Sequence, residues 1–326
     1  MSTSINKYFY VVASLSEMNN LQIISSDYRS ICNFDEMEDL FWDGDLALPK
    51  AVAHHFGVRR GINLFLACEV PPGTGLGSSS SAAVAMIKAL STLCDQPLSR
   101  EELAELACTV EIDMLKMPIG KQDQYAAAYG GLNVMHFRAD GVTVEPLPVP
   151  PGTLPRLEQQ LMLFFTGVSR HSTTILREQT AASARGQVGA ITALHGMKEL
   201  AGRVVDALTA GDTEVIGHLL HEAWQRKRRL ASGVTTPLID TAYAAALACG
   251  ATGGKITGAG GGGYLMVACP PSKQESVTLA LKEIGLTRMH FRFDTQGATV
   301  LMNTLGVAAT PFRQPVRPLV AQEVYA

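Results

Sequence analysis

A glycine- and serine-rich segment in the first third of the chain has the residue types that bind a phosphate. It reads PPGTGLGSSSS over residues 71–81, between an expected strand and an expected helix. Glycines let a ligand approach the backbone closely, and free N–H groups at a helix start, together with the helix dipole, favour an anion. The residues predicted to bind it are Pro72, Gly73, Gly75, Leu76, Gly77, Ser78, Ser79 and Ser80.

A plainer interpretation of this loop is a turn whose serine caps the following helix. Three alternating glycines and four serines exceed what one cap requires, and serine hydroxyls are oxygen ligands of the kind that Mg²⁺ prefers. The loop matches neither standard nucleotide motif. Ser78 stands where a Walker A loop has its lysine and where the dinucleotide fingerprint has its third glycine.

A second glycine-rich segment reads GGKITGAGGGG over residues 253–263. Gly258, Gly260 and Gly263 match the dinucleotide fingerprint by letter, but the segment leads into an expected strand rather than a helix. Two interpretations stay open. The segment is either a tight turn with close backbone packing, or a place where Gly260 and Gly261 contact a substrate.

Two carboxylates and a lysine follow the first loop. Glu111 lies on an expected helix, and Lys121 and Asp123 lie at the start of the next one. Phosphoryl transfer requires a metal site and a group that orients or deprotonates the acceptor hydroxyl. One carboxylate could hold Mg²⁺ with a serine while the other acts as base, and Lys121 could steady Asp123 or the transferring group. Taken alone, Asp123 also suits a helix N-cap and Glu111 a solvated helix face.

A mixed set of strands and helices must position these residues. Strand and helix do not alternate strictly along the chain, which favours an α+β fold. Ser99 and Glu102 form a capping-box pattern at the start of the helix that carries Glu111. Strands are expected at residues 3–13, 21–25, 62–70, 161–165, 264–268 and 289–293, a hairpin at 132–147, and a loop with a helix start at 35–45. Other helices are expected at residues 46–56, 82–94, 122–129, 173–210, 213–230, 237–249 and 274–284.

The chain length and a proline-rich run predict two domains. At about 150 residues per domain, 326 residues are enough for two. The run PVPPG at residues 148–152 marks the expected boundary. The prediction is an amino-terminal domain over residues 1–150, with the phosphate loop, and a carboxy-terminal domain over residues 151–326.

Composition argues against several classes of protein. Hydrophobic residues make up 47% and charged residues 17%, which excludes a disordered chain. The 27 Lys and Arg against 30 Asp and Glu give a net charge of −3, so no nucleic-acid partner is expected. No apolar run reaches the length of a membrane span. Six cysteines without a C-x-x-C pair, and no secretory signal pattern, predict a reducing, cytoplasmic location.

Together these motifs resemble the GHMP kinase superfamily. Residues 71–79 match its P-x-x-x-G-L-G-S-S-A-A pattern, with Ser80 and Ser81 in place of the two alanines. Residues 255–263 resemble the third family motif, and GKQDQYAAAYGG at 120–131 resembles the segment that supplies the catalytic aspartate. GSSSS and GKQDQY look most like the sugar-1-kinases that act on D-glycero-D-manno-heptose 7-phosphate.

The resemblance implies a two-domain α+β fold with the active site between the domains. It implies ATP- and Mg²⁺-dependent phosphorylation of the anomeric hydroxyl of a sugar phosphate, for the synthesis of nucleotide-activated heptose. Asp123 would orient or deprotonate that hydroxyl, with Lys121 beside it. Ser79 and Glu111 would bind Mg²⁺, and Ser78 with the loop amides would hold the ATP phosphates. The implied partners are these small molecules, with a homodimer as a possible assembly.

One family feature is not found in the sequence. The first motif, of the type R-I-x-F-x-G-G-G-T-D, belongs before the strand at 3–13. The chain is therefore expected to begin at an internal methionine, without residues that help bind the sugar. The missing motif favours one alternative, a truncated homologue that binds sugar or nucleotide without catalysis. A second alternative is a kinase for an unphosphorylated sugar such as fucose or galactose. Intact Ser79, Glu111 and Asp123 favour an enzyme.

Two groups of basic residues are candidates for binding a phosphate already present on the sugar. QRKRR at residues 225–229 ends an expected helix, where a solvated face that interacts with the helix dipole is the alternative. Arg170 and His171 form the second group. Arginine suits this role because it binds phosphate through two parallel hydrogen bonds.

Overall fold

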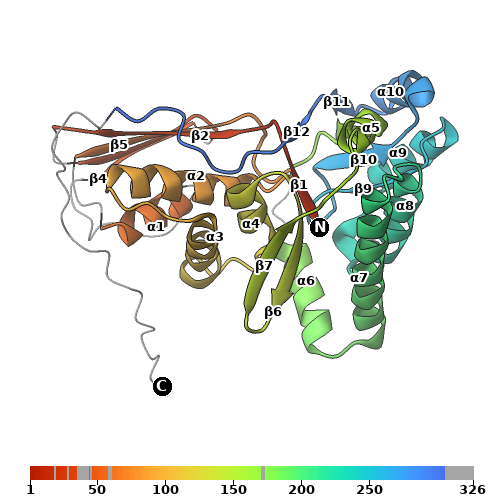
Figure 1. The fold of residues 1–326 in the computed structure, drawn as a ribbon, viewed down its shortest axis with the longest axis horizontal. Helices are drawn as coiled ribbons and strands as arrows, with labels where there is room; N and C mark the ends of the chain where they lie inside the picture. The colour runs from red at the N-terminus through yellow and green to blue at the C-terminus, as the bar shows by residue number, and fades with distance from the viewer. Residues whose placement is uncertain are drawn as a thin grey trace.

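Sheets and helices are mixed along the chain (Figure 1). The computed structural model describes residues 1–17, 20–27, 29–34, 44, 46–57, 61–169 and 173–304. Within these residues there are three four-stranded sheets, with the strand orders β2-β5-β3-β4, β11-β8-β10-β9 and β12-β1-β6-β7. The α+β class predicted from the sequence is therefore confirmed.

The first sheet forms one layer of the amino-terminal half. Its strands are β2 (Phe9–Leu15), β5 (Ile62–Cys68), β3 (Leu21–Ser25) and β4 (Ser30–Phe34). Only β3 and β5 run parallel; the other pairs are antiparallel. Side chains of β3 and β5 alternate between buried and less buried positions, so this sheet buries one face against helices.

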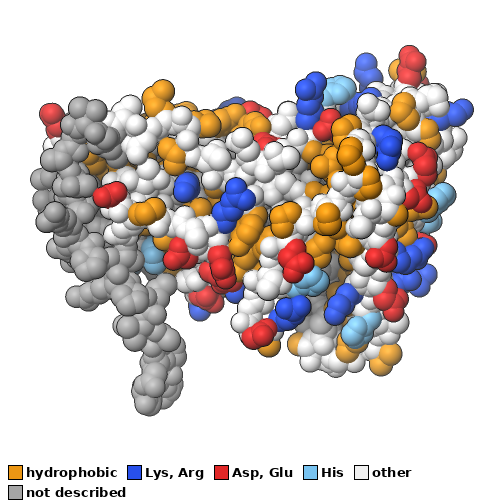
Figure 2. All heavy atoms as spheres, viewed as in Figure 1, with side chains coloured by type: hydrophobic (Ala, Val, Ile, Leu, Met, Phe, Trp, Pro, Cys, Tyr) orange, Lys and Arg blue, Asp and Glu red, His pale blue; other side chains and the backbone are white. Residues whose placement is uncertain are grey.

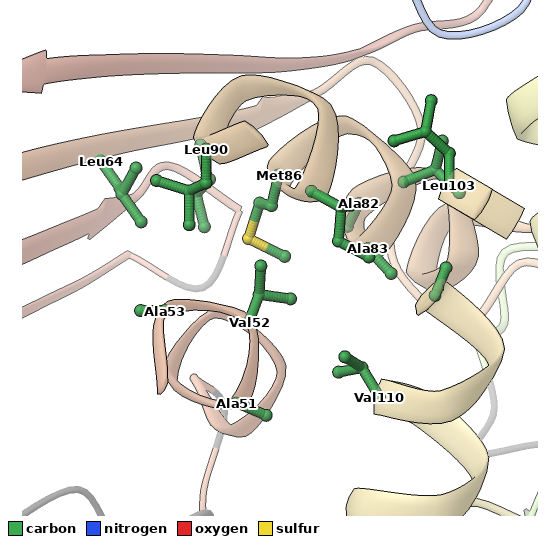
Figure 3. Close-up of a cluster of buried hydrophobic side chains, with 14 of the residues drawn as sticks. Ala51, Val52, Ala53, Leu64, Ala82, Ala83, Met86, Leu90, Leu103 and Val110 are labelled. Carbon is green, nitrogen blue, oxygen red and sulfur yellow. The ribbon is translucent and has the colours of Figure 1, made fainter. Parts of the chain in front are cut away.

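Helices α1 (Ala47–His55), α2 (Ser78–Leu93), α3 (Arg100–Cys108) and α4 (Gln122–Tyr129) pack with this sheet around one hydrophobic core. Figure 3 shows Met86 of α2 pointing toward Val52 of α1, with Leu90 beside Leu64 of β5. The buried side of α2 combines the small Ala82 and Ala83 with larger apolar side chains such as Ile87.

The capping box predicted from Ser99 and Glu102 is present. The Glu102 amide donates to Ser99 Oγ at 3.2 Å and the Ser99 amide to Glu102 Oε2 at 2.8 Å. The helix carries Glu111 as expected, but α3 continues from Thr109 to Met114 as a π-helical turn, which the sequence did not predict. Such turns are rare and often lie at functional sites. This one carries Glu111.

The second sheet is the centre of the carboxy-terminal half. It contains β8 (Leu161–Phe165), β10 (Tyr264–Ala268), β9 (Gly253–Ile256) and β11 (Thr287–Met289), all paired antiparallel. A core around Trp224 fills the space between sheet and helices. The helices of this half are α5 (Thr153–Gln160), α6 (Thr173–Ala184), α7 (Val188–Thr209), α8 (Ile216–Lys227), α9 (Pro237–Ala248) and α10 (Gln274–Glu283).

The third sheet links the two halves of the chain. It joins β1 (Ser2–Ile5), the hairpin of β6 (Leu132–Arg138) and β7 (Gly141–Pro146), and β12 (Phe293–Asp294). After β12 the chain stays on the first half, where the Ala298 amide donates to the Ala127 carbonyl at 3.1 Å. Residues close to the end thus pack on the amino-terminal half, and the boundary near residue 150 stays a prediction.

Several expected elements differ in extent. The strand expected at 3–13 is two strands, because β1 pairs with β6 and β12 whereas β2 pairs with β5. The helix expected at 173–210 is interrupted at Gly186, whose φ is +66°. The strand expected at 289–293 is replaced by β11 and β12. Strands β4 and β9 and helix α5 were not predicted. Of the segment 35–45, only Gly44 lies within the described residues.

Surface charge is mixed in sign on the face seen in Figure 2, where basic and acidic side chains are interspersed. No helix among the described residues is both long and apolar enough to cross a membrane.

The two glycine-rich segments pack directly against each other, although more than 150 residues separate them. A Cβ added to Gly258 would lie 2.6 Å from Cα of Gly75, and one added to Gly75 would lie 2.9 Å from the Thr257 carbonyl oxygen. One added to Gly263 would clash with the Thr74 carbonyl oxygen. Only residues without a side chain permit this approach. The glycines of the second segment therefore allow its backbone to pack closely on the first loop.

Replacing Gly258 by Ala should lower the free energy of unfolding by more than the cost of a left-handed alanine alone, which is about 1–2 kcal/mol. The added cost comes from the contact with Gly75. Gly57→Ala is the matched control, because its φ of +61° is close to the +58° of Gly258 and a Cβ added to Gly57 would meet nothing within 4 Å. Urea unfolding measures both variants. Equal losses would show that the two loops do not constrain each other.

Candidate active site

The first glycine-rich loop has the backbone conformation that its sequence predicts. Gly73, Gly75 and Gly77 have φ values of +75°, +78° and +72°. Gly77 is the N-cap of α2, so the helix begins at Ser78, four residues earlier than expected. First-turn N–H groups of a helix have no partner within the helix, and here they follow a loop of left-handed glycines. This arrangement suits an anion.

A buried carboxylate lies beside the start of α2. Glu111 has 0% of its surface exposed. Ser79 Oγ donates to Glu111 Oε1 at 2.5 Å, and Ser80 Oγ donates to Oε2 at 2.8 Å. Gln124 Nε2 also donates to Oε2, at 2.6 Å. The structure therefore brings together Ser79 and Glu111, which sequence analysis proposed as metal ligands.

The two serines differ in what they offer a ligand. Ser79 is exposed, whereas Ser80 has 3% of its surface exposed and its hydroxyl is directed to Glu111. Ser80, predicted to bind the cofactor, thus holds Glu111 in place in this structure, and ligand contact through its hydroxyl stays a prediction. The expectation that Glu111 could lie on a solvated helix face is wrong, because the π-helical turn directs it inward.

Burial sets the electrostatics of Glu111. Desolvation raises its pKa, the donors from Ser79, Ser80 and Gln124 lower it, and desolvation is the larger effect. The nearby charge of Asp123 raises the pKa further. A carboxylate in such a position gains most from a cation, which compensates the charge that burial disfavours.

Asp123 lies in the first turn of α4, next to the phosphate loop. A Cβ added to Gly77 would lie 3.4 Å from Asp123 Cγ and 3.6 Å from its Oδ2. The N-cap of α4 is Lys121, so Asp123 is not the cap that its position also allowed. Its side chain keeps solvent access, yet surrounding protein desolvates it enough to raise its pKa. The carboxyl group is thus accessible and more basic than an ordinary aspartate.

Lys121 does not contact Asp123 in the described structure. Its Nζ forms an ion pair with Glu105 at 2.9 Å, and the Tyr125 hydroxyl donates to the same carboxylate. Glu105 and Lys121 are both partly exposed, so the pair contributes little to stability. The expected steadying of Asp123 by Lys121 is not formed, and a catalytic role of Lys121 stays a prediction.

Gln124 was not singled out from the sequence. Its side chain is fully buried and its amide donates to Glu111. The only sequence signal is its place next to Asp123, in the run KQDQY. Because neighbours on a helix point to different faces, Asp123 and Gln124 reach the site from different sides of the first turn of α4.

The second glycine-rich segment closes the site from the other half. The Gly261 amide donates to the Val234 carbonyl at 2.7 Å, and the Gly263 amide donates to the Val168 carbonyl at 2.8 Å. A Cβ added to Gly260 would lie 2.6 Å from the Val234 carbonyl oxygen. These bonds support the tight-turn interpretation, and substrate contact by Gly260 and Gly261 stays a prediction.

The basic residues considered for a sugar phosphate have different environments. Arg170 and His171 lie outside the described residues. Arg228 forms an ion pair with Asp240 at 2.9 Å and lies over the Trp224 ring. Its guanidinium is thus already partnered. Lys227, the preceding residue, donates instead to the Gly258 carbonyl.

Comparison with known proteins agrees with this geometry. Residues 46–131 match the family model "GHMP kinases N terminal domain" and residues 204–285 match "GHMP kinases C terminal". A D-glycero-alpha-D-manno-heptose 7-phosphate kinase of Campylobacter jejuni is 30% identical over 304 residues, which cover 91% of this chain and 89% of that protein.

Two further relatives are informative. The crystal structure of a D-glycero-D-manno-heptose 1-phosphate kinase from Bacteroides thetaiotaomicron superposes with a TM-score of 0.73 at 29% identity, covering 90% of this chain and 87% of that one. An L-fucokinase/L-fucose-1-P guanylyltransferase of Bacteroides fragilis is 27% identical over 302 residues, which cover 85% of this chain and 31% of that protein.

Replacing Ser80 by Ala should lower the free energy of unfolding by about 1–3 kcal/mol, because the buried Glu111 carboxylate loses a donor. Ser78→Ala is the control: it lies on the same turn, and its side chain does not bind Glu111. It should change stability by less than about 0.5 kcal/mol. Urea unfolding without nucleotide compares the two variants. A loss no larger for Ser80→Ala than for the control would contradict the role given to Ser80.

Proposed function

The chain belongs to the GHMP kinase family, and we propose that it transfers the terminal phosphoryl group of ATP to the anomeric hydroxyl of a sugar phosphate of the D-glycero-D-manno-heptose 7-phosphate type. It is a sugar kinase of the GHMP type. The observation that carries the proposed phosphoryl transfer is the juxtaposition of Asp123 with Gly77, which brings a carboxyl group next to the loop that suits a phosphate.

The proposed donor site uses the loop and the start of α2. Gly73, Gly75 and Gly77 are all left-handed. Because glycine has no side chain, nothing stands between their backbone and a bound phosphate. Ser78 opens the helix, so its amide and those that follow would donate to phosphate oxygens. Binding of ATP phosphates at this loop is the use that its geometry supports best.

The oxygen groups of the site also fit Mg²⁺. Ser79 offers an accessible hydroxyl that already contacts the Glu111 carboxylate, and hard cations prefer such oxygen ligands. No group of three or more His, Cys, Asp and Glu suited to a metal occurs among the described residues. The ion would therefore share its coordination between Ser79, Glu111 and the nucleotide. When bound, Mg²⁺ would offset the charge of the phosphate oxygens.

Asp123 is the proposed base. Its carboxylate would accept a hydrogen bond from the acceptor hydroxyl, orient it toward the phosphate loop and take its proton as the new bond forms. Desolvation raises the pKa of Asp123, which makes its carboxylate a better proton acceptor than that of an ordinary aspartate. Position and electrostatics thus favour the same role.

The choice of sugar rests on the relatives. The Campylobacter jejuni protein is named a heptose 7-phosphate kinase and is similar over nearly its whole length. The Bacteroides fragilis protein, whose name describes an L-fucokinase, supports the alternative of an unphosphorylated sugar.

A sugar panel tests the proposed substrate. With Mg²⁺ and ATP, D-glycero-D-manno-heptose 7-phosphate should release ADP well above the rate without sugar, whereas mannose, fucose and galactose should not. Coupled ADP detection measures this. Release with fucose or galactose alone would replace the proposal by the unphosphorylated-sugar alternative. Release with none of them would favour a homologue that binds without catalysis.

Replacing Asp123 by Asn should lower kcat by orders of magnitude, because the amide cannot take the proton, while ADP affinity stays the same. Asp140→Asn is the control, since Asp140 is exposed in the turn between β6 and β7. Steady-state kinetics and ADP titration measure the two effects. Wild-type turnover in Asp123→Asn would remove Asp123 from the mechanism.

A further inference from the structure

Two lysines meet where α8 ends beside β9. Lys227 is the last residue of α8 and Lys255 lies in β9, the edge strand of its sheet. The helix lies directly on the strand because Gly217 and Gly253 have no side chain at the contact. A Cβ at either position would collide with the opposing backbone or side chain. Lys255 is close enough for its charge to lower the pKa of Lys227.

Neither ammonium has a carboxylate partner in the described part of the chain. Ion pairs there involve other basic residues. Lys227 has 8% of its surface exposed and donates to the Gly258 carbonyl, which uses one of its three protons. Lys255 is half-buried, and no hydrogen-bond partner of its side chain is present among the described residues.

Burying two lysine charges side by side lowers the stability of the protein when no ligand is bound. Burial lowers the pKa of Lys227 to about 7 and also lowers that of Lys255. Buried charges are ordinarily paired, so two adjacent lysines without a counter-ion among the described residues favour an anion that a ligand supplies.

The lysines lie next to the proposed phosphate loop. Lys227 donates to the carbonyl of Gly258. Gly258 in turn packs on the phosphate loop, because a Cβ added to it would lie 2.6 Å from Cα of Gly75. Lys227 is thus separated from the phosphate loop by one residue of the second glycine-rich segment. An anion bound by the lysines would lie at the edge of the proposed active site.

We propose that Lys227 and Lys255 form a second oxyanion site, which binds a phosphate monoester group of a substrate. The proposal rests on the proposed function in taking that substrate to be the acceptor sugar phosphate or the nucleotide. It revises the expectation from the sequence, because Arg228 of the same basic run is paired with Asp240, whereas Lys227 faces the glycine-rich loops.

Binding of inorganic phosphate tests the site directly. Phosphate is titrated by thermal shift with ADP and Mg²⁺ present, on the wild-type chain, Lys255→Met and the control Lys282→Met, an exposed lysine on α10. Lys255→Met should weaken phosphate binding about tenfold or more, the loss of one charged hydrogen bond. Lys282→Met should bind as the wild type does. Equal affinities in all three proteins would overturn the proposal.

The same melting curves separate a binding role from a structural one. Without phosphate, Lys255→Met should melt at or above the wild-type temperature, because it removes an unpaired, half-buried charge. A lowered melting temperature would make Lys255 a structural residue and overturn its assignment. If Lys255→Met fails to fold, Lys255→Gln, which keeps a polar end group without the charge, replaces it in the titration.

Kinetics identify which substrate supplies the phosphate. A rise of about tenfold in KM for the heptose phosphate alone in Lys255→Met assigns the site to the acceptor, and a rise for ATP alone assigns it to the donor. No change in either KM would contradict a role in substrate binding. If the sugar panel fails, the phosphate titration still decides whether the lysines bind an oxyanion, so the two proposals fail independently.

Discussion

The close packing of two glycine-rich backbones is the constraint on which the rest of the site depends. Gly75 and Gly258 approach until neither has room for a side chain. This contact links the phosphate loop of the first half to the strand-loop-strand of the second, and Val70, Leu163 and Tyr264 bury apolar surface beside it. Once the two segments are held together, the start of α2, the first turn of α4 and the end of α8 all lie around the same point.

Two groups of charges near the contact of the glycine-rich segments lack a partner of opposite sign among the described residues. On one side, Glu111 and Asp123 are carboxyl groups whose pKa values are raised by desolvation. On the other, Lys227 and Lys255 are ammonium groups whose pKa values are lowered by burial. Each place would be stabilised by an ion of the opposite sign. A bound metal and phosphate groups would supply such ions, which explains why the chain retains charges that cost stability in their absence.

Local patterns in the sequence predicted much of this arrangement. The capping box at Ser99, the left-handed glycines of the first loop and the helix that begins beside Asp123 all depend on neighbouring residues, and all were confirmed. The π-helical turn that carries Glu111 was not predicted, because no local pattern in the sequence distinguishes it from the α-helix that it continues. The pairing of Lys121 with Glu105 and the meeting of Lys227 with Lys255 likewise depend on tertiary contacts between distant residues.

In the proposed reaction, Asp123 directs an anomeric hydroxyl toward the phosphate loop, so that the sugar is phosphorylated at its anomeric position. Phosphorus NMR of the product formed from D-glycero-D-manno-heptose 7-phosphate, ATP and Mg²⁺ tests it most directly. The expected spectrum has a second sugar phosphorus signal that couples to the anomeric proton, which identifies a 1,7-bisphosphate. A new phosphorus signal coupled to any other sugar proton, or inorganic phosphate as the only new product, would contradict it.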